Sequence, residues 1–218
     1  MKISACIFDL DGVIVDTAKY HYLAWRRLAR EMGFDFSPEH NEQLKGISRM
    51  QSLEILLQIG GISLTDAEMI DTAQRKNAWY VDYITTITPD EILPGVVNFL
   101  NDLKKNHIKI ALGSASKNAG LILQRIELKD IFDAVIDGNK ITKAKPDPEI
   151  FLMAAQETAA KSSECVVFED AQAGIEAANN AGMVSIGVGD PETLEQADLV
   201  ISGFSNMSWK LLKEWLSH

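Results

Sequence analysis

Two aspartates near the N-terminus have the spacing that phosphoryl transfer to a carboxylate requires. Asp9 follows the apolar run Ile3 to Phe8, and Asp11 comes two residues later, just before Gly12. One ionised carboxylate can attack phosphorus, while a second carboxyl group gives and takes the proton of the attacking or leaving oxygen. Gly12 allows the chain to turn sharply after the pair. The spacing therefore predicts Asp9 as nucleophile and Asp11 as general acid and base.

Other polar residues follow apolar runs elsewhere in the chain. Ser114 ends the run that starts at Ile108, and Glu169 and Asp170 end the run that starts at Cys165. Any one of them could be an ordinary loop residue, or, for the serine, a helix N-cap. Parallel strands bring their carboxyl ends to one edge of a sheet, so we expect these residues to converge on Asp9. Ser114 would then donate its hydroxyl and backbone N–H to a phosphoryl oxygen.

The expected cluster of carboxylates would repel an incoming phosphate unless a cation offsets its charge. Oxygen ligands favour Mg²⁺, which binds few protein carboxylates and keeps several waters. We predict one Mg²⁺ per site, held by the side chains of Asp9 and Asp170 and by the backbone carbonyl of Asp11. Glu169 is either a further ligand or the partner of a ligand.

A lysine before a proline is the candidate for a fixed positive charge. Pro146 favours an extended backbone at Lys145, which can then direct its ammonium group inward. There it would offset the charge of Asp9 and of the transferring phosphoryl group. Lys143 is the alternative, and we expect it to be solvated.

Apolar runs alternate with amphipathic stretches through most of the chain. This alternation predicts a Rossmann-like α/β fold with a doubly wound parallel sheet. The expected strands are the runs ISACIF, IKIAL, FDAVI, CVVF and VSIGV, and the expected helices cover 96–105, 119–128, 148–157, 173–181 and 209–215. Gly182 is a candidate C-cap.

One long segment lacks this alternation. Residues 17–87 are helical in pattern almost throughout, so we predict an inserted helical domain there and a catalytic core made of 1–16 and 88–218. The connections at Asp16 and Thr17, and at Thr85 to Pro89, are expected hinges, since Pro89 disfavours a helical Thr88.

Taken together, the motif D-L-D-G-V-x-x-D-T at Asp9, the strand-end Ser114, Lys145-Pro146 and Glu169-Asp170 resemble the four signature motifs of the haloacid dehalogenase superfamily. D-x-D alone would be a weak signal, whereas the full set in order is specific. The resemblance implies a Rossmann-like core with a mobile helical cap.

Within the superfamily, the cap resembles that of the β-phosphoglucomutase family. The run Asn41 to Arg49, the later Ser52 and the triplet Arg75-Lys76-Asn77 carry this similarity. The resemblance implies that Thr17, His21 and Lys76 place Asp11 when the cap closes. It also implies the following substrate-binding residues: Trp25, Lys45, Gly46, Arg49, Ser52, Lys76, Ala115, Ser116 and Asn118. Without the resemblance, the charges of this region would be assigned to a solvated helix.

The Arg49 guanidinium offers a bidentate fork for the non-transferring phosphate of a bisphosphorylated sugar. The implied activity is interconversion of β-D-glucose 1-phosphate and glucose 6-phosphate through phospho-Asp9, with β-glucose 1,6-bisphosphate as priming intermediate. The alternative is a sugar-phosphate phosphatase of the same superfamily. A signalling phospho-acceptor module is disfavoured, because it would have no use for a helical insert of roughly seventy residues.

The amino-acid composition limits the kinds of molecule that the protein can be expected to bind. The net charge of −10 disfavours a broad nucleic-acid-binding surface, although an anionic metabolite could bind at a local positive site.

The cysteines and the N-terminal segment bear on the location of the protein. Cys6 and Cys165 lie in apolar runs and lack the spacing of a zinc site. The apolar run before Asp9 is too short for a signal peptide or a membrane span. We expect a cytoplasmic monomer that binds sugar phosphates.

Overall fold

The five apolar runs expected as strands form five strands of a six-stranded sheet. The computed structural model describes residues 2–216. Its strands, all paired in parallel, lie in the order β3-β2-β1-β4-β5-β6. They are β1 (Ala5–Phe8), β2 (Lys109–Gly113), β3 (Ala134–Ile136), β4 (Cys165–Glu169), β5 (Val184–Val188) and β6 (Leu199–Ile201). This is the Rossmann strand order, and it confirms the predicted fold class.

Strand β6 was not expected from the sequence. It contains three residues at the edge of the sheet and pairs only with β5 among the described strands. An edge strand this short has too few residues to show a pattern of its own.

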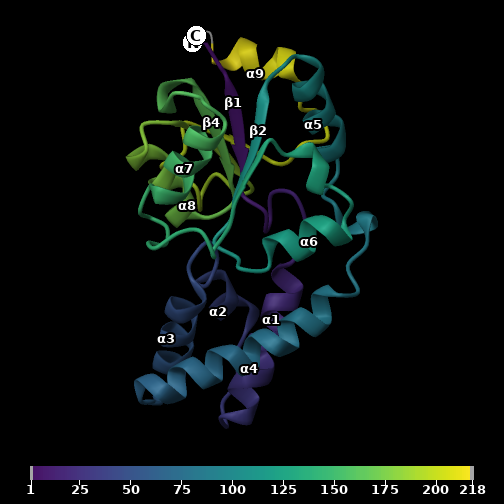
Figure 1. The fold of residues 1–218 in the computed structure, drawn as a ribbon. Coiled ribbons are helices and arrows are strands. Elements are labelled where there is room, and N and C mark those ends of the chain that lie inside the picture. The colour runs from purple at the N-terminus through teal and green to yellow at the C-terminus, as the bar shows by residue number, and fades with distance from the viewer. Residues whose placement is uncertain (1, 217–218) are drawn as a thin grey trace.

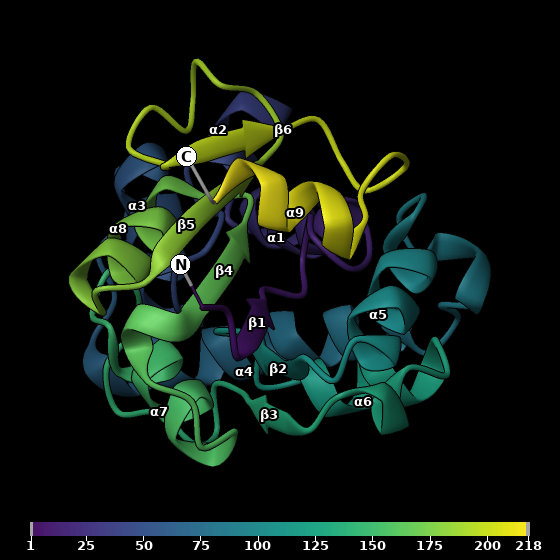
Figure 2. The same ribbon diagram turned by 90° about the horizontal axis from the view of Figure 1, so that it is seen from above.

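The central strands are buried on both faces, because their alternate side chains pack against different helices. Cys6 and Phe8 belong to one cluster, and Ala5 and Ile7 belong to another on the opposite face. Figure 2 shows α5 (Val96–Lys105), α6 (Ala119–Arg125) and α9 (Trp209–Trp215) on one face of the sheet, and α7 (Glu149–Glu157) and α8 (Gln172–Asn180) on the other. Single 3₁₀ turns occur at Pro89–Glu91, Lys129–Ile131 and Ser162–Glu164.

Helices α1 to α4 lie beyond the carboxyl ends of the strands (Figure 1). They are α1 (Ala18–Glu31), α2 (Pro38–Glu42), α3 (Arg49–Gly60) and α4 (Asp66–Ile84). Ser37, Ser48 and Thr65 begin α2, α3 and α4 with capping boxes, which satisfy free N–H groups of the first turns. Helices α1, α3 and α4 share an apolar cluster of their own, around Trp25, Leu28 and Leu53. We call helices α1 to α4 the cap.

The cap is inserted between β1 and β2, as the resemblance implied. The exact division at residues 17 and 87 stays a prediction, since Tyr80, Ile84 and Ile87 pack into the same apolar cluster as the sheet. Among residues 2–216, no helix is long and apolar enough to cross a membrane.

Candidate active site

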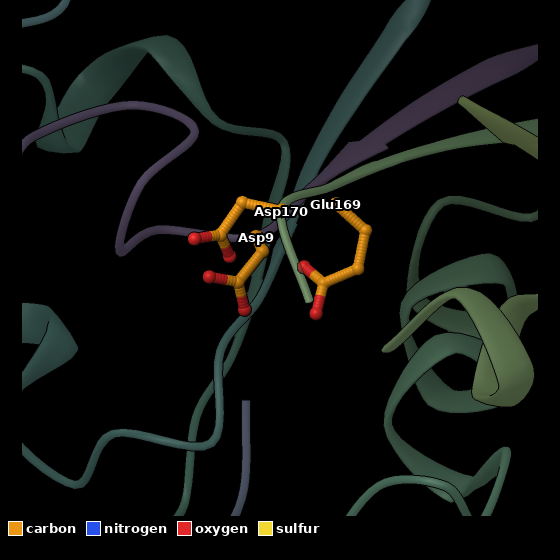
Figure 3. Close-up of side chains that lie close together, drawn as sticks. All are labelled: Asp9, Glu169 and Asp170. Atoms are coloured by element: carbon orange, nitrogen blue, oxygen red, sulfur yellow. The ribbon is translucent and has the colours of Figure 1, made fainter. Parts of the chain in front are cut away.

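Three carboxylates meet where β1 and β4 end. The two strands are neighbours with Phe8 opposite Phe168, so Asp9 and Glu169 leave the sheet side by side. One carboxylate oxygen each from Asp9, Glu169 and Asp170 lies within 4.8 Å of the others. Figure 3 shows the three side chains grouped at this edge. The sheet thus brings together the carboxylates that were expected to converge.

The electrostatics of this cluster fit a bound cation. Burial, together with the neighbouring Asp9, raises the pKa of Glu169 well above its usual range and raises the pKa of Asp170 to about 7. In the described chain, Glu169 Oε2 is buried without a hydrogen-bond partner. Buried carboxylate oxygens with no other hydrogen-bond donor are suitable ligands for a hard divalent ion such as Mg²⁺.

Lys145 is the fixed positive charge of the cluster. It is fully buried, and its Nζ donates to Asp9 Oδ1 at 2.6 Å and to Glu169 Oε1 at 3.2 Å. Burial alone would lower the pKa of Lys145, but the two carboxylates outweigh this effect and raise it. Lys143, by contrast, is exposed and pairs with Asp147 at 3.3 Å. Lys145 and not Lys143 therefore lies beside Asp9.

Asp11 is placed by its neighbours to hold a proton. Its N–H donates to Asp9 Oδ2 at 2.9 Å, and the Thr17 hydroxyl donates to Asp11 Oδ1. Burial, with the charges of Asp9 and Asp170, raises the pKa of Asp11 well above its usual range. Gly12 turns the chain with φ +78°, and a Cβ there would overlap the Asp170 side chain. A neutral Asp11 can donate a proton to a leaving oxygen.

A second buried group lies on the cap side, between α1 and α4. Lys76 Nζ lies 3.2 Å from His21 Nδ1, 4.1 Å from the Trp25 ring centroid and 4.9 Å from the Tyr80 ring centroid. Burial, followed by the charge of Arg49, lowers the pKa of Lys76, and burial followed by Lys76 lowers that of His21. The imidazole is therefore kept neutral.

Arg49, the first residue of α3, is half-buried, and burial lowers its pKa from the usual value. Within residues 2–216, no carboxylate oxygen lies within 4.0 Å of either Arg49 or Lys76. The cap thus presents two basic side chains that lack an anionic partner among these residues. Such a pair favours an anionic ligand.

The core carboxylates and the cap cations face one cavity of about 550 Å³. Of the residues assigned from the sequence, those that line the cavity are Asp9, Asp11, His21, Trp25, Lys45, Gly46, Arg49, Ser52, Lys76, Ala115, Ser116, Asn118 and Asp170. The remaining four, Thr17, Ser114, Lys145 and Glu169, are buried. Thr17, Lys145 and Glu169 hydrogen-bond to Asp9, Asp11 or one another. The structure brings these residues together, while their individual roles stay predictions.

One detail expected of Ser114 is wrong. Its backbone N–H donates to the Ile136 carbonyl at 3.0 Å, so this group continues the pairing of β2 with β3 and is not free for a phosphoryl oxygen. The hydroxyl accepts from the Ser116 N–H at 3.2 Å and still has its own proton to donate.

The residues that line the cavity and that the sequence did not assign include Asn41, Asn77, Tyr80 and Lys117. Tyr80 follows Lys76 on α4 by four residues, so it shares the same helix face. Its ring lies beside that of His21, with ring centroids 4.0 Å apart. The helical spacing from Lys76 was a signal that could have identified Tyr80.

Comparison with known proteins agrees with this arrangement. Residues 3–182 match the family model described as haloacid dehalogenase-like hydrolase. The chain is 45% identical over 214 residues to the β-phosphoglucomutase of Bacillus subtilis, covering 97% of this chain and 95% of that protein. The crystal structure of β-phosphoglucomutase from Clostridium difficile matches with a TM-score of 0.94 at 45% identity, over 99% of this chain and 100% of that one.

A phosphatase is also similar to this chain. The phosphorylated carbohydrates phosphatase of Thermotoga maritima is 31% identical over 189 residues, or 84% of this chain and 83% of that protein. Its identity is lower than that of the β-phosphoglucomutases, and it covers less of the chain. The chain therefore belongs to the haloacid dehalogenase-like hydrolase family and, within it, to the β-phosphoglucomutases.

Proposed function

We propose that the protein interconverts β-D-glucose 1-phosphate and glucose 6-phosphate by phosphoryl transfer through Asp9. The main support for this proposal is that one cavity is lined both by carboxylates of the core and by basic side chains of the cap. The core supplies Asp9 and Asp11, while the cap supplies Arg49 and Lys76 without carboxylate partners. A mutase needs both, because it must bind one phosphate of a sugar while the other end reacts.

The proposed cycle begins with phospho-Asp9, which β-glucose 1,6-bisphosphate forms at the start. The 6-hydroxyl of bound β-glucose 1-phosphate attacks the phosphorus of phospho-Asp9, Asp11 takes the hydroxyl proton, and the bond from phosphorus to Asp9 breaks to give β-glucose 1,6-bisphosphate. This intermediate then turns round. Asp9 attacks the phosphorus of its 1-phosphate, the bond from phosphorus to the sugar oxygen breaks, that oxygen takes the proton of Asp11, and glucose 6-phosphate leaves the re-formed phospho-Asp9.

Lys145 supports both transfers, because its ammonium group is already hydrogen-bonded to Asp9 and needs no rearrangement as charge develops. Thr17 holds Asp11 in place through its hydroxyl. Mg²⁺, bound by Asp9, Asp170 and the carbonyl of Asp11 with Glu169 beside it, would neutralise negative charge on the transferring phosphoryl group.

Arg49, Ser116 and Asn118 are the proposed contacts of the non-transferring phosphate, with Lys45, Gly46 and Ser52 near the sugar. His21 and Lys76 are proposed to place Asp11 when the cap closes. We further propose that the enzyme acts as a monomer in the cytoplasm.

A sugar-phosphate phosphatase is the second candidate, because the relative from Thermotoga maritima carries that name. It would use the same transfer from the sugar to Asp9 and then hydrolyse phospho-Asp9. The comparisons favour the mutase. The fate of the phosphoryl group distinguishes the two activities, since water and sugar compete for the same phospho-enzyme.

The decisive experiment incubates the protein with β-glucose 1-phosphate, Mg²⁺ and a trace of β-glucose 1,6-bisphosphate, and measures glucose 6-phosphate and free phosphate together. A mutase forms glucose 6-phosphate with little phosphate release, whereas a phosphatase releases phosphate in proportion to substrate consumed. Asp9→Asn should abolish both products. Full mutase turnover by Asp9→Asn would show that the nucleophile is a different residue.

A further inference from the structure

One hydrogen bond joins the cap to the loop that follows β2. The Asn118 side-chain nitrogen donates to Asn77 Oδ1 at 2.9 Å. Asn77 lies on α4 of the cap, while Asn118 is the N-cap residue of α6 in the core. Both residues line the cavity.

Asn118 is held from the core side as well. Its backbone N–H donates to the Ser116 hydroxyl at 3.2 Å, and the N–H of Ser116 donates to the Ser114 hydroxyl at 3.2 Å. The backbone of this loop is therefore fixed from the end of β2 onward. The Asn118 side-chain amide can still rotate about the bond that joins it to Cβ. On the cap side, this amide contacts Asn77.

The rotation of that amide decides whether it can bind an anion. An asparagine side chain offers two N–H donors on one end and a carbonyl acceptor on the other. A phosphate oxygen needs an N–H, and a carbonyl turned toward it would be repulsive. With one N–H of Asn118 given to the Asn77 carbonyl, the second N–H is directed away from that bond and remains available.

We propose that Asn77 is a positioning residue for phosphate binding: it orients the Asn118 amide so that an N–H faces the non-transferring phosphate. This rests on the proposed function, in which Asn118 contacts that phosphate. Because the contact crosses from cap to core, Asn118 is correctly oriented only while α4 lies against the loop.

The test measures binding of β-glucose 1,6-bisphosphate by calorimetry in an Asp9→Asn background with Mg²⁺, where no turnover consumes the ligand. Asn77→Ala should raise Kd about two- to tenfold, the usual effect of losing one hydrogen bond. In the active enzyme the same change should raise KM more than it lowers kcat. Alanine is a good helix former, so α4 should keep its stability, which thermal melting checks.

The matched control is Gln58→Ala, on α3 of the cap. Gln58 is an exposed amide that is not among the residues lining the cavity, and in the described chain its side chain makes no hydrogen bond to the core. Its truncation should leave Kd unchanged. Equal effects of Gln58→Ala and Asn77→Ala would overturn the proposal.

A double-mutant cycle separates positioning from direct binding. If Asn77 acts through Asn118, then Asn77→Ala/Asn118→Ala should bind no more weakly than Asn118→Ala alone, within about twofold. Losses that multiply would mean that Asn77 acts independently, and the proposal would fail. Wild-type turnover is measured separately, so failure of the mutase assay with these binding results intact would reject only the proposed function.

Discussion

At the scale of single residues, the most informative feature is a buried group of carboxylates whose pKa values are raised. Burial and Asp9 raise the pKa of Asp170 from its usual 3.8 to about 7. A raised pKa means that the folded state binds the proton more tightly than the unfolded state does. The stability contribution of Asp170 is therefore lost as the pH rises from about 4 to about 7.

This gives a prediction for metal binding. In EDTA, the melting temperature should fall as the pH rises from about 4 to about 7, and Mg²⁺ should reverse the fall because the cation replaces the proton. The apparent affinity for Mg²⁺ should be about tenfold or more weaker at the lower pH. Differential scanning calorimetry at several Mg²⁺ concentrations measures both, and Asp170→Asn should remove most of the dependence. A stabilisation by Mg²⁺ that is equal at both pH values would contradict the assignment.

Arg49 is the residue expected to separate mutase chemistry from simple hydrolysis. Hydrogen bonds to a charged group contribute about 1.5–3 kcal/mol, so Arg49→Ala should lower mutase kcat/KM by about ten- to a hundredfold. Hydrolysis of a small phosphate ester without a second phosphate should change little. Arg75→Ala is the control, since Arg75 is exposed and pairs with Glu31 at 3.6 Å. Steady-state kinetics with both substrates give the comparison, and equal losses in the two reactions would argue against a phosphate contact.

At the scale of elements, the loop between α2 and α3 brings the cap close to the core. Gly46 has φ +72°, and a Cβ at this position would come within 2.7 Å of the Ala171 Cβ, which lies just after β4. A side chain would therefore push the loop away by several tenths of an ångström. A glycine at position 46 thus allows both the positive φ of the loop and its close approach to Ala171.

Gly46→Ala should lower mutase turnover by about ten- to a hundredfold, because small displacements at a closed site are costly. The share of free phosphate among the products should rise as water enters. Gly61→Ala is a matched control: Gly61 has φ +63° and nothing within 4 Å of its Cβ position. Both variants should lose about 1 kcal/mol of stability from backbone strain. An unchanged product ratio in Gly46→Ala would exclude the role of this contact.

The helices and strands also show which parts of the fold could be predicted from the sequence alone. Helix α5 occupies the expected residues 96–105, and β1, β2 and β4 follow their apolar runs closely, because strong periodicity and burial coincide there. The short strand β6 was not predicted. Its pairing depends on β5 being already in place, and three residues carry no local signal.

Within the candidate site, too, the features that depend on contacts between distant segments could not be predicted. Asp9, Lys145 and Asp170 could be predicted from motifs at strand ends, since the parallel sheet itself makes them converge. The hydrogen bond of Asn77 to Asn118 could not, because it depends on how α4 and the loop after β2 approach each other. The N–H of Ser114 was misassigned for a related reason: it is used to extend the pairing with Ile136.

At the scale of the whole molecule, charge is divided unevenly. The chain carries a net charge of −10, yet the basic side chains of Arg49 and Lys76 line the cavity and Lys145 lies beside Asp9. The overall field disfavours polyanions, while this local group favours a small phosphorylated ligand. Binding selectivity for small anions thus follows from where the few buried cations are placed.

Cap and core are joined near the cavity by a few polar contacts. Lys45 Nζ lies 3.9 Å from Asp170 Oδ2, and Asn118 donates to Asn77 at 2.9 Å. The C-terminal part of α4 also packs into the apolar cluster of the core. The cap has its own apolar cluster as well, so it can keep its internal packing if the polar contacts break. Polar contacts between the parts of a chain permit relative motion more readily than a large apolar interface does.

We therefore expect the cap to close on the ligand. Small-angle X-ray scattering of Asp9→Asn should show a smaller radius of gyration with Mg²⁺ and β-glucose 1,6-bisphosphate than without them, and Mg²⁺ alone should cause less change. Sedimentation of the same samples should give the mass of one chain, 24.1 kDa. The physical reason is that the bisphosphate contacts both parts, and its binding free energy favours the arrangement in which both contacts exist. Identical scattering with and without ligand would mean that cap and core behave as one rigid body, and that water is excluded without closure.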